Sequence, residues 1–201
     1  MSLKNTALNE VWVACHVIVA FLVLYAFSVD GVRALEFGLL GLSEQLSIFI
    51  FLPHGIRILA VWFLRHRALV PLFIAHMCLY QLFSNMPPFW AQVPLALIGA
   101  FSPWLSFKLL LWTNIPAYYQ GDTGRPQANP LGVPILAGII AAIFNGLGSF
   151  GVLMTQDLKY ADFEFLLGYI VGDILGVLIV FICIMSFREV VNYRSAGRSV
   201  M

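Results

Sequence analysis

Long apolar stretches separated by short polar segments follow one another along most of this chain. About 20 mostly apolar residues form a helix that crosses a bilayer, where backbone polar groups must find partners within the helix itself. Six such stretches can be marked, at about 11–29, 43–64, 68–84, 91–113, 131–155 and 163–187. The pattern predicts an all-α, polytopic membrane bundle of about six transmembrane helices.

Proline and glycine interrupt several of these stretches. Pro53 and Gly55 lie within the second, where a proline removes a backbone donor and a glycine admits a neighbouring segment. We expect this helix to be broken or kinked there. Pro94 and Pro103 are expected to bend or end the fourth helix. The fifth stretch is rich in small residues, which allow close packing between helices in lipid, so we expect it to be buried in protein.

Composition supports a location in the membrane. The chain has 201 residues, of which 61% are hydrophobic and 10% are charged, and its mean hydropathy is +0.90. Soluble domains are roughly half apolar and a quarter charged. The 11 Lys and Arg residues nearly balance the 10 Asp and Glu residues, which argues against a nucleic-acid surface. Cys15, Cys78 and Cys183 lie far apart in apolar runs, so we expect buried apolar side chains rather than disulfides or a metal site.

Basic residues near the ends of the stretches set the expected orientation, because Lys and Arg are retained on the cytoplasmic side. With the N-terminus inside, seven lie on the cytoplasmic side (Lys4, Arg65, Arg67, Arg125, Arg188, Arg194 and Arg198) and two on the other (Arg33 and Lys159). We therefore expect both termini in the cytoplasm. Segment 114–130 is expected to be a cytoplasmic loop. The chain 1–201 is expected to form a single transmembrane domain.

Three ionisable residues lie within the apolar stretches. Lys108 is near the cytoplasmic end of the fourth, where its side chain can reach the headgroups, so we expect no site there. Arg57 and Asp173 lie near the middle of the second and the last stretch. A lone charge at this depth costs at least a few kcal/mol, so we expect these two residues to pair. Two roles are open for such a pair. Either it is purely structural and fixes the register of the helices, or it belongs to a ligand or proton site.

Further polar side chains accompany this pair. His54 stands inside the Pro53–Gly55 break, and Asn145 lies in the fifth stretch. A break leaves backbone carbonyls in need of partners, so we expect a cavity that binds a small polar ligand or a partner's polar group. Its walls would carry His54, Arg57, Asn145 and Asp173. An amide such as Asn145 also commonly joins membrane helices by a hydrogen bond, which keeps a structural role open.

No motif in the chain supports catalysis or identifies a cofactor. The sequence lacks a Gly-x-Ser-x-Gly elbow, a phosphate loop and a cluster with metal-ligand spacing. His16 and His76 each stand alone on an apolar stretch. We expect both to be hydrogen-bonded interior residues rather than metal or haem ligands. The protein is therefore expected not to be an enzyme.

Two segments resemble the membrane-associated sensor domains of the first MASE-type class, which are found in bacterial signalling proteins. The second stretch contains Pro53-x-Gly55, an apolar run and Arg65-x-Arg67, and is similar to that family's Pro-x-Gly break. The last stretch contains Gly172-Asp173-x-x-Gly176, followed by an apolar run, and is similar to the family's closing element. Gly172 and Gly176 are expected to let another helix come close.

This resemblance covers about residues 43–187 and implies an integral sensor or ligand-binding module of the bacterial cytoplasmic membrane. Members of the family usually continue into a cyclase, a kinase or another output domain. We expect this chain to lack its own effector, so that any signal passes to a separate polypeptide. His54 and Arg57 do not match features of the family.

Two other functions stay open. The aromatic-rich exterior and the small-residue fifth stretch also fit an accessory subunit of a larger respiratory, photosynthetic or motility complex. A broken helix with charge at mid-depth is also how many transporters build their sites, although no inverted repeat is visible. The expected partners are the lipid bilayer, another membrane protein or a second copy of the chain, and a small polar ligand.

Overall fold

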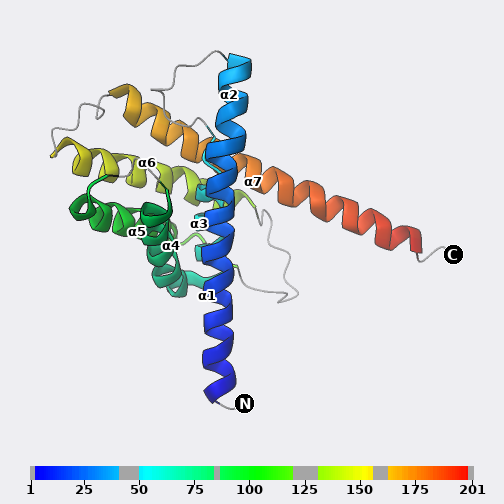
Figure 1. Ribbon diagram of the computed structural model, residues 1–201. Coiled ribbons are helices and arrows are strands. Elements are labelled where there is room, and N and C mark those ends of the chain that lie inside the picture. Colours follow the sequence, from blue (N-terminus) through cyan, green and yellow to red (C-terminus); the bar gives the residue numbers. More distant parts are fainter. Residues whose placement is uncertain (1–2, 41–49, 84–86, 120–130, 156–162, 199–201) are drawn as a thin grey trace.

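The computed structural model describes residues 3–40, 50–83, 87–119, 131–155 and 163–198, and this part of the chain is helical without strands (Figure 1). α1 (Leu3–Ala26) continues through a π-helical segment, η1 (Phe27–Val32), into α2 (Arg33–Leu40), and the three form one long rod. The remaining elements are α3 (Pro53–Leu64), the 3₁₀ turn η2 (Arg65–Ala68), α4 (Leu69–Leu82), α5 (Phe89–Trp112), α6 (Gly132–Met154) and α7 (Phe163–Arg198).

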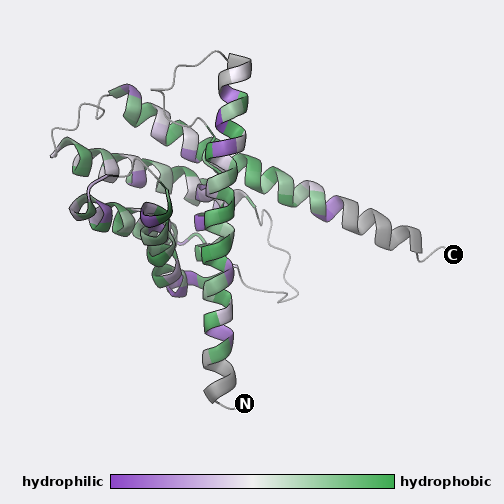
Figure 2. Cartoon of the chain, viewed as in Figure 1, coloured by the Kyte–Doolittle hydropathy of each residue, from purple (hydrophilic) through white to green (hydrophobic). Residues whose placement is uncertain are grey.

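Five helical stretches among the described residues are long and apolar enough to cross a membrane: Leu8–Glu36, Pro53–Leu82, Phe89–Trp112, Gly132–Met154 and Phe163–Glu189. Figure 2 shows that hydrophobic residues run along each of these helices. The described part of the chain is therefore all-helical, and five of its helical stretches are suited to a membrane by length and composition. The stretches expected at 43–64 and 68–84 correspond to one of the five, which contains α3, η2 and α4.

α3 and α4 run in opposite directions beside the α1 rod. At the start of α3, the backbone N–H of Leu52 donates to Ser28 Oγ at 3.2 Å, beyond the end of α1. Just before α4, Arg67 forms an ion pair with Glu10, near the other end of α1. The reversal occurs at Arg65, whose φ of 58° and ψ of −132° lie outside the helical region.

Proline has two different roles in these helices. Pro53 occupies the first turn of α3, where its missing N–H has no intrahelical partner to lose. The expected break therefore coincides with a helix start, and residues 43–49 lie outside the described part of the chain. Pro94 and Pro103 lie inside α5, which ends at neither of them.

The small residues of α6 let its neighbours pack closely. Ala137, Ala141 and Ala142 are fully buried. The expectation that the fifth stretch is buried in protein is met only in part, because Leu136, Ile143 and Leu147 of α6 are exposed. A Cβ added to Gly146 would lie 2.5 Å from Ile170 Cγ1 of α7. α6 packs against both α5 and α7, and α7 also packs against α3. Residues from α3, α6 and α7 therefore meet inside the bundle.

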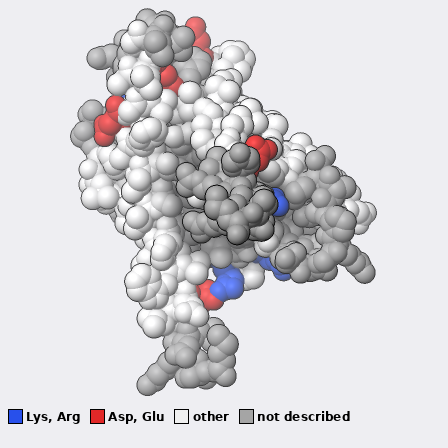
Figure 3. All heavy atoms as spheres, turned by 90° about the vertical axis from the view of Figure 1, so that its right-hand side faces the viewer, with Lys and Arg blue, Asp and Glu red and all other residues white. Residues whose placement is uncertain are grey.

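Many large hydrophobic side chains of the described helices are exposed. Figure 3 shows one face on which acidic atoms lie mainly toward the α2 end and basic atoms mainly toward the other end. Cys15 and Cys183 are exposed and Cys78 is partly exposed, so the expectation that all three are buried is wrong. The reason is that lipid tails solvate an apolar side chain as well as a protein core does.

Candidate functional site

Four polar side chains meet where α3, α6 and α7 come together. Arg57 Nη2 donates to both carboxylate oxygens of Asp173, each at 3.0 Å. Asn145 Nδ2 donates to Asp173 Oδ2 at 2.7 Å. The fourth member is His54, and none of the four side chains is more than 1% exposed. We call His54, Arg57, Asn145 and Asp173 the Arg57–Asp173 cluster.

Helical spacing positions the members of this cluster. His54 and Arg57 are three residues apart, which places them on one face of α3. Asp173 lies four residues after Tyr169 on α7, and Asn145 Nδ2 also reaches the Tyr169 hydroxyl at 3.4 Å. Tyr169 was not among the candidate residues predicted from the sequence, although its i, i+4 spacing from Asp173 was a signal for it.

Glycines allow the start of α3 to lie directly against α7. The backbone N–H of Phe51 donates to the Gly172 carbonyl at 2.9 Å. A Cβ added to Gly176 would lie 2.0 Å from the Phe51 carbonyl oxygen, and one added to Gly55 would lie 2.6 Å from Val180. The Phe51 ring in turn lies 5.7 Å from Arg57 Cζ. The Pro53–Gly55 and Gly172–Gly176 segments therefore contact each other beside the cluster.

His54 has an unusual pair of neighbours. Its Nε2 lies 3.1 Å from the Gly138 carbonyl oxygen, which can only accept, so Nε2 carries a hydrogen. Its Nδ1 lies 3.3 Å from Asp173 Oδ2 but forms no hydrogen bond. In a neutral imidazole with this tautomer, Nδ1 is an acceptor that faces a carboxylate acceptor. A shared proton or an added donor is needed to make this contact favourable.

Two further polar atoms of the cluster are buried without a hydrogen-bond partner. Arg57 Nε is a donor and Asn145 Oδ1 is an acceptor, and neither is matched within the described residues. A buried polar group left unpaired costs about 1–3 kcal/mol. The cluster therefore combines a fixed ion pair with unmet capacity for both donating and accepting hydrogen bonds.

The isolated histidines are engaged within their own helices. His16 Nδ1 lies 2.7 Å from the Trp12 carbonyl oxygen, and His76 Nδ1 lies 2.8 Å from that of Leu72. His76 is buried as expected, whereas His16 is exposed, so the interior position expected for His16 is wrong. Among the described residues, no three His, Cys, Asp or Glu side chains lie together as metal ligands.

No family model matches this chain, and no curated protein or solved structure matches it.

Proposed function

We propose that this chain is a multi-pass membrane protein whose Arg57–Asp173 cluster binds a small polar ligand and passes the effect of binding to a partner protein. The observation that carries the proposal is a set of three buried atoms in the cluster that have no hydrogen-bond partner within the described part of the chain: His54 Nδ1, Arg57 Nε and Asn145 Oδ1. A ligand with both a donor and an acceptor group meets this demand. A proton shared between His54 Nδ1 and Asp173 satisfies His54 Nδ1 but leaves Arg57 Nε and Asn145 Oδ1 without partners among the described residues.

The cluster lies where ligand binding can change the packing of three helices. Asp173 joins α7 to α3 through Arg57 and to α6 through Asn145. A ligand that competes for these hydrogen bonds favours one packing of the three helices over another. It shifts the equilibrium between the two packings to the extent that it binds one of them more tightly. The resemblance to bacterial membrane-associated sensor domains supports this function. Two of the segments that carry it, Pro53-x-Gly55 and Gly172-Asp173-x-x-Gly176, meet at the cluster, whereas Arg65-x-Arg67 lies at the other end of α3.

The proposal includes six spans with both termini in the cytoplasm of a bacterial cell. Six spans follow if α3 and α4 each cross the membrane, and their opposite directions beside α1 support this count. The seven-to-two distribution of basic residues supports the orientation.

A second candidate is an accessory subunit of a larger membrane complex. In Leu8–Glu36, the first of the five membrane-length helical stretches, 11% of the most apolar segment is buried inside the protein. The corresponding share is 44% in both Pro53–Leu82 and Phe89–Trp112. A helix with so much free apolar surface suits docking onto another membrane protein. The cluster would then be a register that fixes the helices.

Native mass spectrometry of protein extracted from its source membrane in mild detergent tests the two functions together. The variant His54→Leu/Asn145→Leu removes two of the unpaired atoms. The matched control Gln81→Leu/Gln92→Leu removes a polar contact between α4 and α5, where Gln81 Nε2 donates to Gln92 Oε1 at 3.0 Å. Loss of a small-molecule mass or a change of partners in the first variant alone supports the ligand function. An unchanged ligand and partner set in the folded first variant contradicts it.

A further inference from the structure

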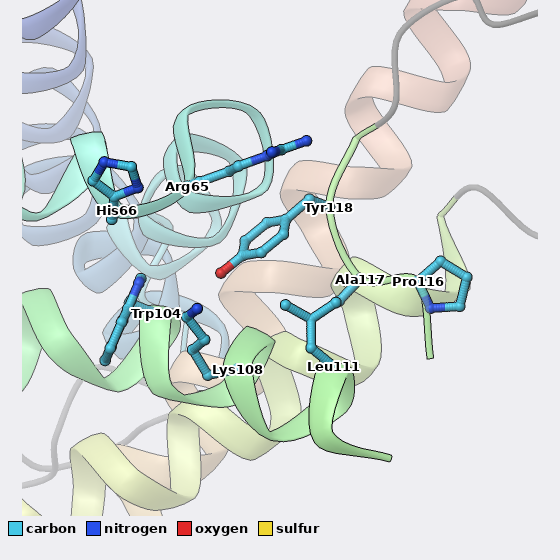
Figure 4. Close-up of a pocket in the computed structure, with 8 residues that line it drawn as sticks. All are labelled: Arg65, His66, Trp104, Lys108, Leu111, Pro116, Ala117 and Tyr118. Carbon is cyan, nitrogen blue, oxygen red and sulfur yellow. The ribbon is translucent and has the colours of Figure 1, made fainter. Parts of the chain in front are cut away.

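A cavity of about 670 Å³ lies at the end of α3 away from the Arg57–Asp173 cluster (Figure 4). One wall is the turn η2, with Arg65 and His66. The opposite wall is the last part of α5, with Trp104, Lys108 and Leu111. The segment after α5 forms a further side of the cavity, with Pro116, Ala117 and Tyr118. The cavity therefore lies where apolar helices end and polar segments begin.

The two cations of this cavity are held against aromatic rings. Arg65 Cζ lies 5.4 Å from the centre of the Tyr118 ring, and Lys108 Nζ lies 5.6 Å from the centre of the Trp104 ring. These distances are in the range of cation–π contacts. Among the described residues, no carboxylate forms an ion pair with Arg65 or Lys108. The cavity thus has two positive charges that are positioned but not neutralised by those residues.

Two neutral donors in the same cavity are also unused. Trp104 Nε1 and the Tyr118 hydroxyl oxygen are buried atoms without a hydrogen-bond partner among the residues that the structure describes. Figure 4 shows the indole nitrogen, the Tyr118 hydroxyl and the Lys108 amine directed toward the same space. Burial raises the pKa of the Tyr118 hydroxyl, and the nearby Arg65 opposes the shift, so the hydroxyl keeps its proton at neutral pH. An indole N–H can only donate. The cavity therefore presents donors to an acceptor-rich ligand.

Backbone hydrogen bonds hold the walls in place. The Arg65 N–H donates to the Val61 carbonyl where α3 ends. At the end of α5, Asn114 has a φ of 61°, and its N–H donates to the Leu111 carbonyl at 3.0 Å. The N–H of Tyr119 then donates to the Trp62 carbonyl at 3.2 Å, which ties the segment after α5 to the end of α3. The donors are arranged before any ligand arrives.

We propose that this cavity binds a phosphate group, with Lys108 supplying a direct charged contact and Trp104 and Tyr118 supplying neutral hydrogen bonds. Arg65, whose guanidinium lies over the Tyr118 ring and points away from the shared space in Figure 4, adds positive charge at longer range. A phosphate carries negative charge and several acceptor oxygens, which match this set of donors. The end of a transmembrane bundle gives it two possible sources. One is the headgroup of an anionic phospholipid, and the other is a soluble phosphate compound. The site is separate from the Arg57–Asp173 cluster and does not depend on its function.

The thermal unfolding midpoint of the full chain, purified in neutral detergent, tests this inference. The probes are dioctanoyl phosphatidylglycerol, dioctanoyl phosphatidylcholine and inorganic phosphate, with sodium chloride at matched ionic strength as the control. We expect a concentration-dependent rise of the midpoint with phosphatidylglycerol, with inorganic phosphate or with both. A rise with phosphatidylglycerol but not with phosphatidylcholine or phosphate identifies a lipid headgroup, and a rise with inorganic phosphate identifies a soluble source.

Three variants distinguish binding in the cavity from a non-specific effect of positive charge. Lys108→Met removes one cation, and Trp104→Phe/Tyr118→Phe keeps an aromatic ring at each position but removes both donors. Each is expected to weaken binding of the effective probe by about tenfold or more, as for the loss of hydrogen bonds to a charged group. Arg188→Met, which removes an exposed cation of α7, is the matched control and should bind as the wild type does. The inference is overturned if no probe raises the midpoint, or if Lys108→Met and Arg188→Met have equal effects.

Discussion

Gly176 of α7 lies against the backbone of Phe51, so closely that a Cβ on Gly176 would lie 2.0 Å from the Phe51 carbonyl oxygen and 2.4 Å from its carbonyl carbon. The backbone cannot move aside as the end of a flexible side chain can. One turn earlier, the Gly172 carbonyl accepts the Phe51 N–H at 2.9 Å. The residues just before α3 are therefore fixed to α7 by a contact that only glycine permits.

Gly176→Ala is accordingly expected to lower the free energy of unfolding by at least about 2 kcal/mol, because the added methyl group separates α7 from Phe51. Thermal unfolding in detergent measures the effect. Gly151→Ala is the matched control on α6, since beyond the adjacent helix backbone no atom of the described residues lies within 4 Å of its added Cβ. The control should be neutral or slightly stabilising, because alanine favours the helix. Equal stability of the two variants would show that the close contact is wrong.

The Arg57–Asp173 pair predicts strong non-additivity. Each single change to alanine leaves a buried charge without its partner and is expected to cost about 3–5 kcal/mol. A double replacement, Arg57→Met/Asp173→Leu, removes both charges and should cost much less than the sum of the single losses. A double-mutant cycle on unfolding free energies gives the coupling. Losses that simply add would refute the pairing.

A second close contact involves His76 and Gly99. A Cβ on Gly99 would lie 2.4 Å from His76 Nε2. The imidazole has little freedom to move, because Nδ1 is bonded to the Leu72 carbonyl and the ring lies 4.6 Å from the Phe21 ring. Gly99→Ala should therefore destabilise the protein by roughly 2 kcal/mol.

The same substitution in a His76→Ala background is expected to have a much smaller effect, because the clashing ring is absent. Unfolding midpoints of the four proteins in this cycle provide the measurement. If Gly99→Ala costs the same in both backgrounds, its effect comes from somewhere other than His76.

Topology can be tested at the two ends of one helix. In a chain whose Cys15, Cys78 and Cys183 are replaced by serine, new cysteines are introduced as Pro88→Cys and Thr113→Cys, at exposed positions flanking α5. With six spans and a cytoplasmic N-terminus, a membrane-impermeant maleimide added to intact cells should label the first position and not the second. The opposite labelling pattern would indicate that Pro53–Leu82 crosses only once or that the orientation is reversed.

Sequence reasoning located the helices and the buried charges well. The stretch expected at 131–155 corresponds to α6, Gly132–Met154, because small residues and apolar length are local properties. The expected neighbours Arg57 and Asp173 are in contact, because an unpaired charge at that depth is costly. The same reasoning failed for Cys15 and His16, which face outward, since hydropathy does not distinguish a lipid-facing surface from a protein core in these helices.

By itself, the sequence determined that this protein is helical, that it is suited to a membrane and that two opposite charges lie deep in its apolar stretches. Only the tertiary structure decided what surrounds them: the unpaired His54 Nδ1 and the contact between Gly176 and Phe51 depend on the register of α3 against α7. It also decided that Lys108, for which the sequence indicated no site, shares a cavity with Arg65. The physical reason is that this cavity depends on the backbone turns at Arg65 and Asn114, and a positive φ at an arginine cannot be read from local propensity.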